Sequence, residues 1–513
     1  MLARSHSGAL NGVDSSIVEI EVNVVKGMQS FAIVGLPDAS VKESKDRVTT
    51  AIRNSGYKPQ GELDVTVNLA PADLRKEGPI YDLPIAITLL KASGRIAEGN
   101  LEDIALIGEL SLSGEVRKVR GVLPMVMAMR KIGKKAVLVP TANANEASVV
   151  EGIDVIPVST LREAAAYLTH EIDIKPVFTD LSSVVGSVEG DDFSDIKGQE
   201  TARRAIEVAV AGAHNMLMIG SPGAGKTMIA RRIPSILPPM SVEEALEVSK
   251  IYSAAGCAKG TRAFMTMRPF RAPHNTVSSI GLLGGGTHPI PGEVSLAHRG
   301  VLFLDEFAEF PRHTLEVLRQ PIEDGHVSVS RANASCDFPS RFMLVAAMNP
   351  CPCGYYNDPT RECRCSLQQI ARYQRRVSGP LMDRIDIQIG INAVTPRDLA
   401  SLKKGESSAQ IRERILAARA IQRDRYRDMP GVFTNADVKS RYLEDVCKLT
   451  ASGRAETQRI IDTLNLSARA YDRILRMSRT IADLAGRAEV AQEDVFEAAT
   501  YRMLDKSTDS FWM

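Results

Sequence analysis

The stretch that decides the fold is residues 215–227, which read NMLMIGSPGAGKT. Its apolar first part, residues 216–219, predicts a buried parallel strand, and the residues after it predict a helix. Between them the chain fits the spacing G-x-x-x-x-G-K-[ST]. In this context glycines let backbone N–H groups turn toward phosphates at the positive end of a helix. The pattern predicts a phosphate-binding loop formed by Gly220, Ser221, Pro222, Gly223, Ala224, Gly225, Lys226 and Thr227.

A second motif supports this interpretation against the alternative of a chance glycine turn. Residues 301–306 read VLFLDE, an apolar strand that ends in two carboxylates. Asp305 is suited to hold Mg²⁺ together with the Thr227 hydroxyl, and Lys226 would reach the β- and γ-phosphates. Glu306 is suited to polarise the attacking water. The two motifs predict a core that binds ATP and Mg²⁺ and hydrolyses the nucleotide.

Composition limits the number of domains and the classes of protein to which the chain can belong. The 513 residues suffice for about three domains, and 44% hydrophobic and 24% charged residues are ordinary for a globular protein. The net charge of +1 gives no global attraction to nucleic acid, so any DNA contact must be local. We find no charged-then-apolar leader and no apolar run near the roughly 18 residues of a membrane span. We therefore expect a cytoplasmic protein without a membrane partner.

The amino-terminal region mixes strands and helices. Residues 18–24 alternate apolar and polar side chains and predict a half-buried strand. Helical periodicity over residues 40–54 stops at Gly56, and a second helix is expected from Asp82 to before Gly94. Further strands are expected at residues 30–34, 64–69, 136–140 and 154–158, and a strand–turn–strand unit at 104–119.

Three segments here resemble a known family: SFAIVGLPDASVKESKDRV, VNLAPADLRKEGPIYDLPIAI and IGELSLSGEVRKVRGVLP. They are similar to the amino-terminal domain of the YifB/ComM family of magnesium-chelatase-like AAA+ ATPases, which resembles the Lon protease domain. Where Lon-type proteases carry a serine and a lysine, this chain has Ile80 and Leu123. A Ser–Lys dyad needs both a nucleophile and a base. The departure implies a scaffold or docking domain with an unknown partner, and no protease.

Residues 171–195 are polar and acidic and predict a linker. The next residues open the ATPase core. In AAA+ proteins a segment like this one lines the adenine pocket, so the resemblance implies roles for Ile196 and Gly198. A capped helix start is a compatible alternative.

Two segments are candidates for DNA contact. Residues 268–298 contain Arg268, Arg271 and three consecutive glycines, which exclude a regular helix or central strand. The segment resembles the helix-2 insertion of the magnesium-chelatase branch, which projects toward the pore, although both arginines could instead pair with acids in the core. Residues 323–335 resemble a pre-sensor hairpin with a basic tip, where Arg331 is a candidate phosphate contact and a solvated turn is the alternative.

The resemblance implies three further catalytic residues. Asn349 ends the apolar run 342–349 and occupies the sensor 1 position. Arg384, in the segment SGPLMDRID, matches an arginine that reaches the ATP of a neighbouring subunit, a role that suits an always-charged guanidinium; a local salt bridge is the alternative. Arg469, on a long amphipathic helix, matches sensor 2 of the carboxyl-terminal lid.

Four of the seven cysteines fall within fifteen positions: Cys351, Cys353, Cys363 and Cys365. In a cytosolic chain such a group indicates thiols or metal ligands rather than disulfides. Four thiolates would make a closed tetrahedral Zn²⁺ site, structural rather than catalytic. The C-x-C spacing is less common than C-x-x-C, so reduced free thiols are the alternative.

Together these observations predict an α/β protein with a P-loop AAA+ parallel-sheet core, an amino-terminal Lon-like α+β domain and a carboxyl-terminal helical lid. The expected boundaries are 1–170 for the Lon-like domain, 171–195 for the linker, 196–395 for the core and 396–513 for the lid. The resemblance implies a homo-oligomeric ring, a hexamer, that works on branched or single-stranded DNA as a helicase or branch-migration factor in recombination or natural transformation. The alternatives are the ATPase subunit of a metal-chelatase-like complex and an ATP-dependent protein unfoldase.

Overall fold

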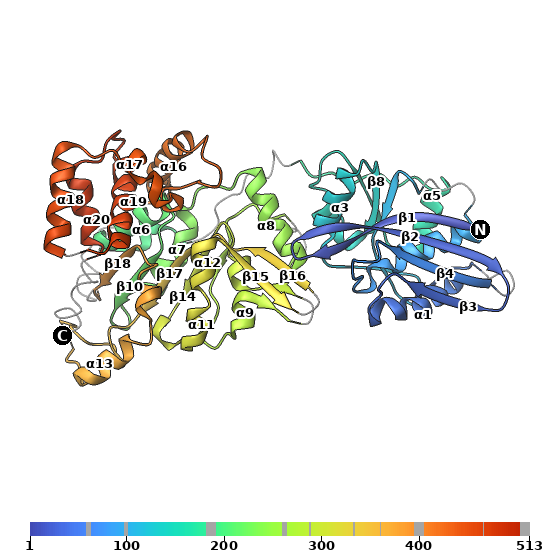
Figure 1. The fold of residues 1–513 in the computed structure, drawn as a ribbon, viewed down its shortest axis with the longest axis horizontal. Helices are drawn as coiled ribbons and strands as arrows, with labels where there is room; N and C mark the ends of the chain where they lie inside the picture. Colours follow the sequence, from blue (N-terminus) through green and yellow to red (C-terminus); the bar gives the residue numbers. More distant parts are fainter. Residues whose placement is uncertain are drawn as a thin grey trace.

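The computed structural model describes residues 1–57, 63–96, 101–180, 191–258, 264–286, 289–331, 334–359, 361–393, 405–464 and 466–502. They form two bodies that lie side by side along the longest axis of the molecule (Figure 1). The amino-terminal domain makes one body, and the ATPase core with its helical lid makes the other. Residues 181–190 of the predicted linker, and the expected junction of core and lid, lie outside the described residues. No helix in the described part of the chain is long and apolar enough to cross a membrane.

The amino-terminal domain is built on a mixed seven-stranded sheet. Its strands in spatial order are β3 (Ser30–Val34), β4 (Leu63–Ala70), β2 (Asp14–Lys26), β1 (Leu2–Asn11), β5 (Ile104–Leu106), β8 (Ala136–Pro140) and β9 (Asp154–Val158). The alternation predicted for residues 18–24 is confirmed, because Val18, Ile20 and Val22 are fully buried. The short hairpin of β6 (Glu109–Leu110) and β7 (Val116–Arg117) confirms the strand–turn–strand unit. The helices are α1 (Ala39–Asn54), α2 (Asp82–Ala92), α3 (Val122–Lys131), α4 (Ala144–Ala147) and α5 (Leu161–Leu168).

The ATPase core is a five-stranded, wholly parallel sheet. Its order is β11 (Phe270–Arg271), β14 (Val301–Leu304), β17 (Met343–Met348), β10 (Met216–Gly220) and β18 (Ile387–Ile391). All residues of β14 and β17 are buried, as expected of strands covered on both faces. The register places the carboxyl ends of β10, β14 and β17 at one edge, where open parallel sheets bind ligands.

Helices and two hairpins surround this sheet. The helices are α6 (Glu200–Gly212), α7 (Lys226–Arg232), α8 (Val242–Ala254), α9 (Ser279–Leu283), α10 (Glu293–Leu296), α11 (Arg312–Glu316), α12 (Arg319–Asp324), α13 (Leu367–Gln374) and α14 (Gly379–Met382). The predicted hairpin consists of β15 (His326–Arg331) and β16 (Ala334–Pro339). The glycine-rich segment forms a two-residue ribbon, β12 (Gly284–Gly285) with β13 (Ile290–Pro291). Gly284 and Gly285 have φ of 96° and 129°, which favours glycine at both positions.

The lid is helical, as predicted. It consists of α16 (Ser408–Arg425), α17 (Leu443–Val446), α18 (Ala451–Leu464), α19 (Ala468–Leu484) and α20 (Gln492–Thr500), which lie at the end of the molecule far from the amino-terminal domain (Figure 1). Within it, Asp483 is buried between Arg425 and Arg479, with oxygen–nitrogen distances of 2.5 and 3.0 Å. Because both arginines contact one carboxylate, α16 is tied to α19.

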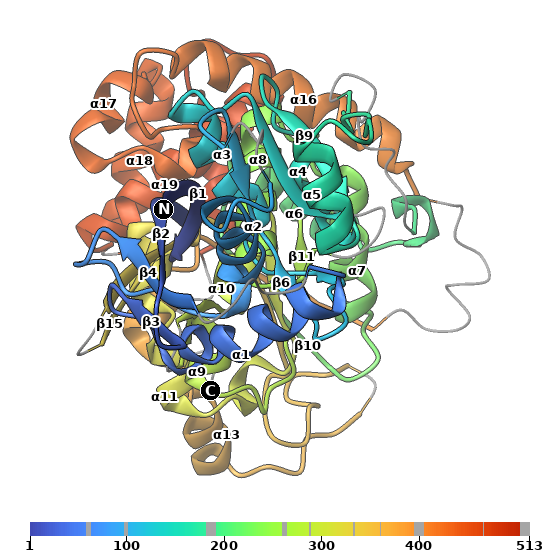
Figure 2. The same ribbon diagram turned by 90° about the vertical axis from the view of Figure 1, so that its right-hand side faces the viewer.

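The two bodies meet at the turn between β1 and β2, which reaches toward α8 and β16 in Figure 1. In Figure 2, which looks along the long axis, the amino-terminal domain lies in front of the core. Val13 from this turn packs with Ile251 of α8 and Phe338 of β16 in a small apolar cluster. Asp14 forms an ion pair with Lys250, and the backbone N–H of Gly121 donates to Ser253 O at 3.0 Å. The amino-terminal domain therefore contacts the base of the hairpin whose tip is predicted to bind DNA.

Candidate nucleotide site

The phosphate-binding loop lies where the sequence predicts it, between β10 and α7. Gly223 and Gly225 have φ of 81° and 90°, a region that side chains with a Cβ rarely adopt. The Lys226 ammonium lies inside the loop, where it donates to Gly220 O at 2.6 Å and Ser221 O at 3.0 Å. Burial lowers the pKa of Lys226 and the charge of Asp305 opposes that shift, so a phosphate beside the ammonium would favour its charged form.

The two residues predicted to hold Mg²⁺ are in contact. The Thr227 hydroxyl donates to Asp305 Oδ2 at 2.6 Å, which joins the start of α7 to the end of β14. A hydroxyl and a carboxylate are hard oxygen donors of the kind that Mg²⁺ prefers, and substrate phosphates and water complete its octahedron. The donor set therefore fits a magnesium ion held by Thr227 and Asp305, which would supply positive charge against the charge that develops on the phosphates.

Glu306 follows Asp305 with φ of 51°, a left-handed conformation that is uncommon for a residue other than glycine. This turn directs its carboxylate to Asn275, whose Nδ2 donates to Glu306 Oε2 at 2.9 Å. The carboxylate predicted to activate water is thus held by an amide from the segment after β11.

Asn349 lies next to this loop, and the adenine segment is tied to the helix that follows the loop. Lys226 Nζ donates to Asn349 Oδ1 at 3.2 Å, so the predicted sensor 1 residue reaches the nucleotide site from the end of β17. Ile196 is fully buried, and its segment is tied to α7 because Arg232 binds the Asp195 carboxylate at 3.1 Å. Gly198 has φ of 69°. Phe193, within the predicted linker, is fully buried in the core, so the packed core begins before residue 196.

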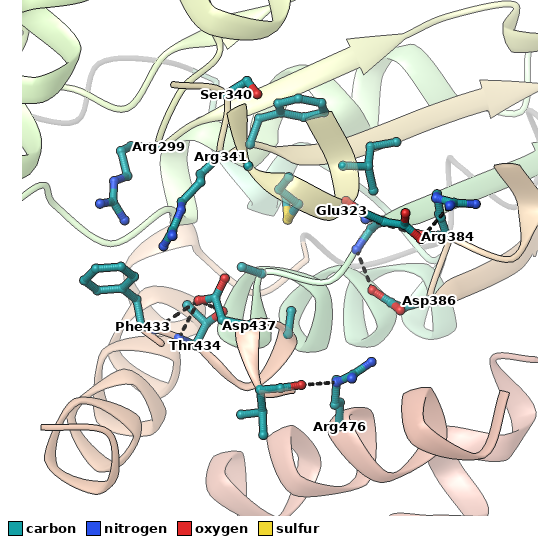
Figure 3. A pocket seen from close by; sticks show the side chains of 18 of the residues that line it. Arg299, Glu323, Ser340, Arg341, Arg384, Asp386, Phe433, Thr434, Asp437 and Arg476 are labelled. Carbon is teal, nitrogen blue, oxygen red and sulfur yellow. Dashed lines mark hydrogen bonds and ion pairs between the residues drawn. The ribbon is translucent and has the colours of Figure 1, made fainter. Parts of the chain in front are cut away.

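Arg384 and Arg469 lie at the opposite edge of the sheet. Both line a cavity of about 700 Å³ between the core and the lid, shown in Figure 3. The carbonyl of Arg384 accepts from Asn215, which precedes β10, whereas the phosphate-binding loop follows β10. Five strand residues span about 16 Å, so the length of β10 separates Arg384 from the loop of its own chain.

Arg384 is 8% exposed, and its guanidinium pairs with Glu323 Oε1 at 2.5 Å (Figure 3). Its Nε has no partner among the described residues. Arg469 is exposed at the start of α19. Further basic side chains line the same cavity, among them Arg299, Arg341, Arg473 and Arg476. Carboxylates line the cavity as well, and Arg473 pairs with one of them, Asp386, so the cavity presents charges of both signs.

The structure pairs Arg268 and Arg271 with acids, the alternative that the sequence left open. Arg268 Nη2 lies 2.6 Å from Glu244 Oε2, and Arg271 forms two bonds of 2.7 Å with Glu293. DNA contact by these two arginines stays a prediction. Arg331 ends β15 beside the hairpin tip, but the tip and the Arg331 side chain lie outside what the structure describes.

Sequence reasoning missed two residues of this site, Asn275 and Glu323. The available signal for Asn275 was topological: β11 pairs in parallel with β14, so a polar residue soon after β11 falls near the end of β14. Glu323 gave no such signal, because its contact with Arg384 joins two residues far apart in the sequence and depends on tertiary packing.

Comparison with known proteins agrees with this geometry. Residues 192–399 match the family described as "Magnesium chelatase, subunit ChlI", residues 20–143 "Subunit ChlI of Mg-chelatase", and residues 405–502 its carboxyl-terminal part. The chain thus has the domains of a magnesium-chelatase-like AAA+ protein, a class that indicates an ATPase.

The chain is also similar to full-length proteins of this class. It is 43% identical over 508 residues to competence protein ComM of Haemophilus influenzae, with 98% of each chain covered. It is 41% identical to YifB of Escherichia coli, covering 98% of this chain and 97% of the relative. Lon protease 2 of Bacillus subtilis is 28% identical over 179 residues, 30% of this chain and 32% of that protein. The chain belongs to the ComM/YifB family of magnesium-chelatase-like AAA+ proteins.

Buried apolar side chains occupy the two positions at which the Lon-type dyad was predicted to be lost. Ile80 is 8% exposed before α2, and Leu123 is fully buried in α3. Hydrocarbon side chains supply neither a nucleophile nor a base. That the domain has no protease activity stays a prediction.

Proposed function

We propose that this protein is an ATP-hydrolysing ring motor that acts on DNA, as a helicase or branch-migration factor in recombination or natural transformation. The proposal of a ring rests on one observation: the catalytic residues of one chain lie at two opposite edges of its sheet. Lys226, Thr227 and Asp305 lie at one edge of the sheet, whereas Arg384 and Arg469 line a cavity at the other.

A second copy brings these parts together. If the cavity of one chain covers the phosphate-binding loop of the next, Arg384 meets the γ-phosphate charge that develops in the transition state. Each contact of this kind is heterologous, and a closing rotation makes it a ring, here a hexamer. ATP and Mg²⁺ are then held by one chain and completed by its neighbour.

The DNA part rests on other observations. A relative that is 43% identical is named a competence protein, which points to foreign DNA as the substrate. The net charge of +1 leaves binding to local cations. Arg331 ends one strand of the hairpin whose other strand, β16, packs against the amino-terminal domain. Phosphate contacts from such a hairpin would bind branched or single-stranded DNA without reading sequence. The motor would work in the cytoplasm, where its cysteines stay reduced.

The deciding experiment measures ATP turnover by the full-length protein with four-way DNA, with an unfolded protein substrate, and with neither. A DNA motor shows higher turnover with DNA and converts labelled four-way DNA to duplex products only when ATP is hydrolysed. The Glu306→Gln variant is the matched control: it should bind ATP and DNA but hydrolyse about 10²–10⁴-fold more slowly, because the water loses its general base.

Two outcomes contradict the DNA motor. Turnover that rises only with the protein substrate would identify an unfoldase. Turnover that responds to neither substrate, with no DNA binding at low salt, would favour the ATPase subunit of a metal-chelatase-like complex.

A further inference from the structure

The loop between β17 and α13, residues 350–366, brings four thiols to one point. The sulfur atoms of Cys351, Cys353, Cys363 and Cys365 all lie within 4.8 Å of one another. Three of the separations are 3.4, 3.6 and 3.7 Å. In the parts of the chain that the structure describes, no other group of three or more metal-binding side chains converges in this way.

These separations match one coordination geometry. Four sulfurs placed about 2.3 Å from a central zinc ion form a tetrahedron whose edges are about 3.8 Å. A disulfide would need a sulfur–sulfur distance of about 2.05 Å. We propose that Cys351, Cys353, Cys363 and Cys365 bind one Zn²⁺ ion. Four protein ligands leave no open position for water, so the ion is structural and takes no part in the chemistry.

The surroundings of the thiols suit a thiolate cluster. The backbone N–H of Cys365 points at Cys363 Sγ, 3.4 Å away. Backbone amides that face thiolates disperse their charge and orient them, as partners of metal ligands do in other sites. Cys351 is fully buried, and the other three ligands are only half-buried, so the ion would fasten the exposed part of the loop to its buried root.

The loop is attached to the nucleotide site at two points. Cys351 lies two residues after Asn349, the sensor 1 candidate that contacts Lys226. Gly354, with φ of 86°, lies so close to Pro222 of the phosphate-binding loop that a Cβ there would stand 2.6 Å from Pro222 Cδ. A bound zinc ion would therefore hold this loop, which we call the brace, against the phosphate-binding loop and would limit the movement of Asn349. This role, unlike the metal binding itself, rests on the proposed ATPase function.

Metal binding is tested first, on the full-length protein purified without chelator. Elemental analysis should find about one zinc per chain, released when a mercurial reagent blocks the thiols. Replacing Zn²⁺ with Co²⁺ should give the visible absorption of tetrahedral cobalt thiolate. Protein without zinc that also takes up no Co²⁺ would overturn the proposal, and so would iron in place of zinc.

Variants locate the site independently of activity. Cys363→Ser with Cys365→Ser should lose the zinc and make the chain more sensitive to trypsin at Arg361 and Arg364, which are exposed in this loop. Cys257→Ser, which changes an exposed thiol outside the loop, should keep both zinc and resistance. Zinc retained by the double variant would overturn the assignment.

The brace is tested by Gly354→Ala in the zinc-loaded protein. The added Cβ should displace Pro222 and lower ATP turnover about 10–100-fold, while the zinc content stays unchanged. Gly133→Ala is the matched control, because Gly133 has φ of 79° but open space around its Cα. Equal turnover in both variants would contradict the brace and leave the zinc assignment to the metal analysis.

Discussion

Asn275 Nδ2 donates to Glu306 Oε2 at 2.9 Å, so the carboxylate that would activate water is held by a residue outside both the phosphate-binding loop and the 301–306 motif. Asn275 follows β11, and the segment that carries it continues into α9 and the glycine ribbon. A movement of this segment would therefore free or retain the Glu306 carboxylate. If the chains form the proposed ring, this contact would link an event elsewhere in the ring to ATP hydrolysis.

The first prediction concerns this link. Asn275→Ala should leave ATP affinity unchanged, raise turnover without DNA and bring the ratio of DNA-stimulated to basal turnover close to one, because Glu306 is no longer held. Thr276→Ala is the control, since the Thr276 hydroxyl pairs only with the neighbouring His274 ring among the described residues. A variant that keeps the wild-type ratio would show that Asn275 does not restrain Glu306.

The second prediction concerns DNA binding. Arg331→Ala should weaken binding about equally for all sequences and reduce the slope of log affinity against log salt by about one unit. Basal ATP turnover should stay near wild type, because β15 lies away from the phosphate-binding loop (Figure 1). Binding and its salt slope can be measured by fluorescence anisotropy. Unchanged affinity at low salt would remove Arg331 from the DNA path.

The third prediction concerns the lid. Asp483→Asn should lower the free energy of unfolding by about 3–5 kcal/mol, because Arg425 and Arg479 lose the buried carboxylate that they share. Asp424→Asn removes an exposed partner of Arg427 and should change stability by about 0.5 kcal/mol or less. Denaturant unfolding followed by circular dichroism compares the two. Equal effects would mean that the buried cluster contributes no more than a surface pair.

Much of the fold could be predicted because local patterns determined it. The structure has β3 at Ser30–Val34, as expected, and α1 within one residue of the expected start. Strand β1 was missed because its buried face carries serines: Ser5 and Ser7 are fully buried, and Ser5 pairs with Thr88 at 2.6 Å. A serine at an inward position breaks the apolar alternation by which a strand is recognised.

The residues of the candidate site likewise divide into those that local motifs predict and those that only tertiary packing places. Lys226, Thr227 and Asp305 could be placed because their roles follow from spacing within one motif and its flanking strand. The partners of Glu306 and Arg384 could not, because Asn275 and Glu323 reach them only through tertiary packing. Which edge of the sheet Arg469 occupies likewise depends on how the lid packs on the core.

The central claim is that each ATP site is completed by a second copy, and mixing two inactive variants tests it most directly. Lys226→Ala removes the phosphate contact from one chain, and Arg384→Ala removes the cation offered to the neighbour. In mixed rings some interfaces join an intact loop from the Arg384→Ala chain to an intact arginine from the Lys226→Ala chain. ATP turnover should therefore rise on mixing and pass through a maximum at intermediate ratios. Turnover that stays flat at every ratio would contradict a shared site.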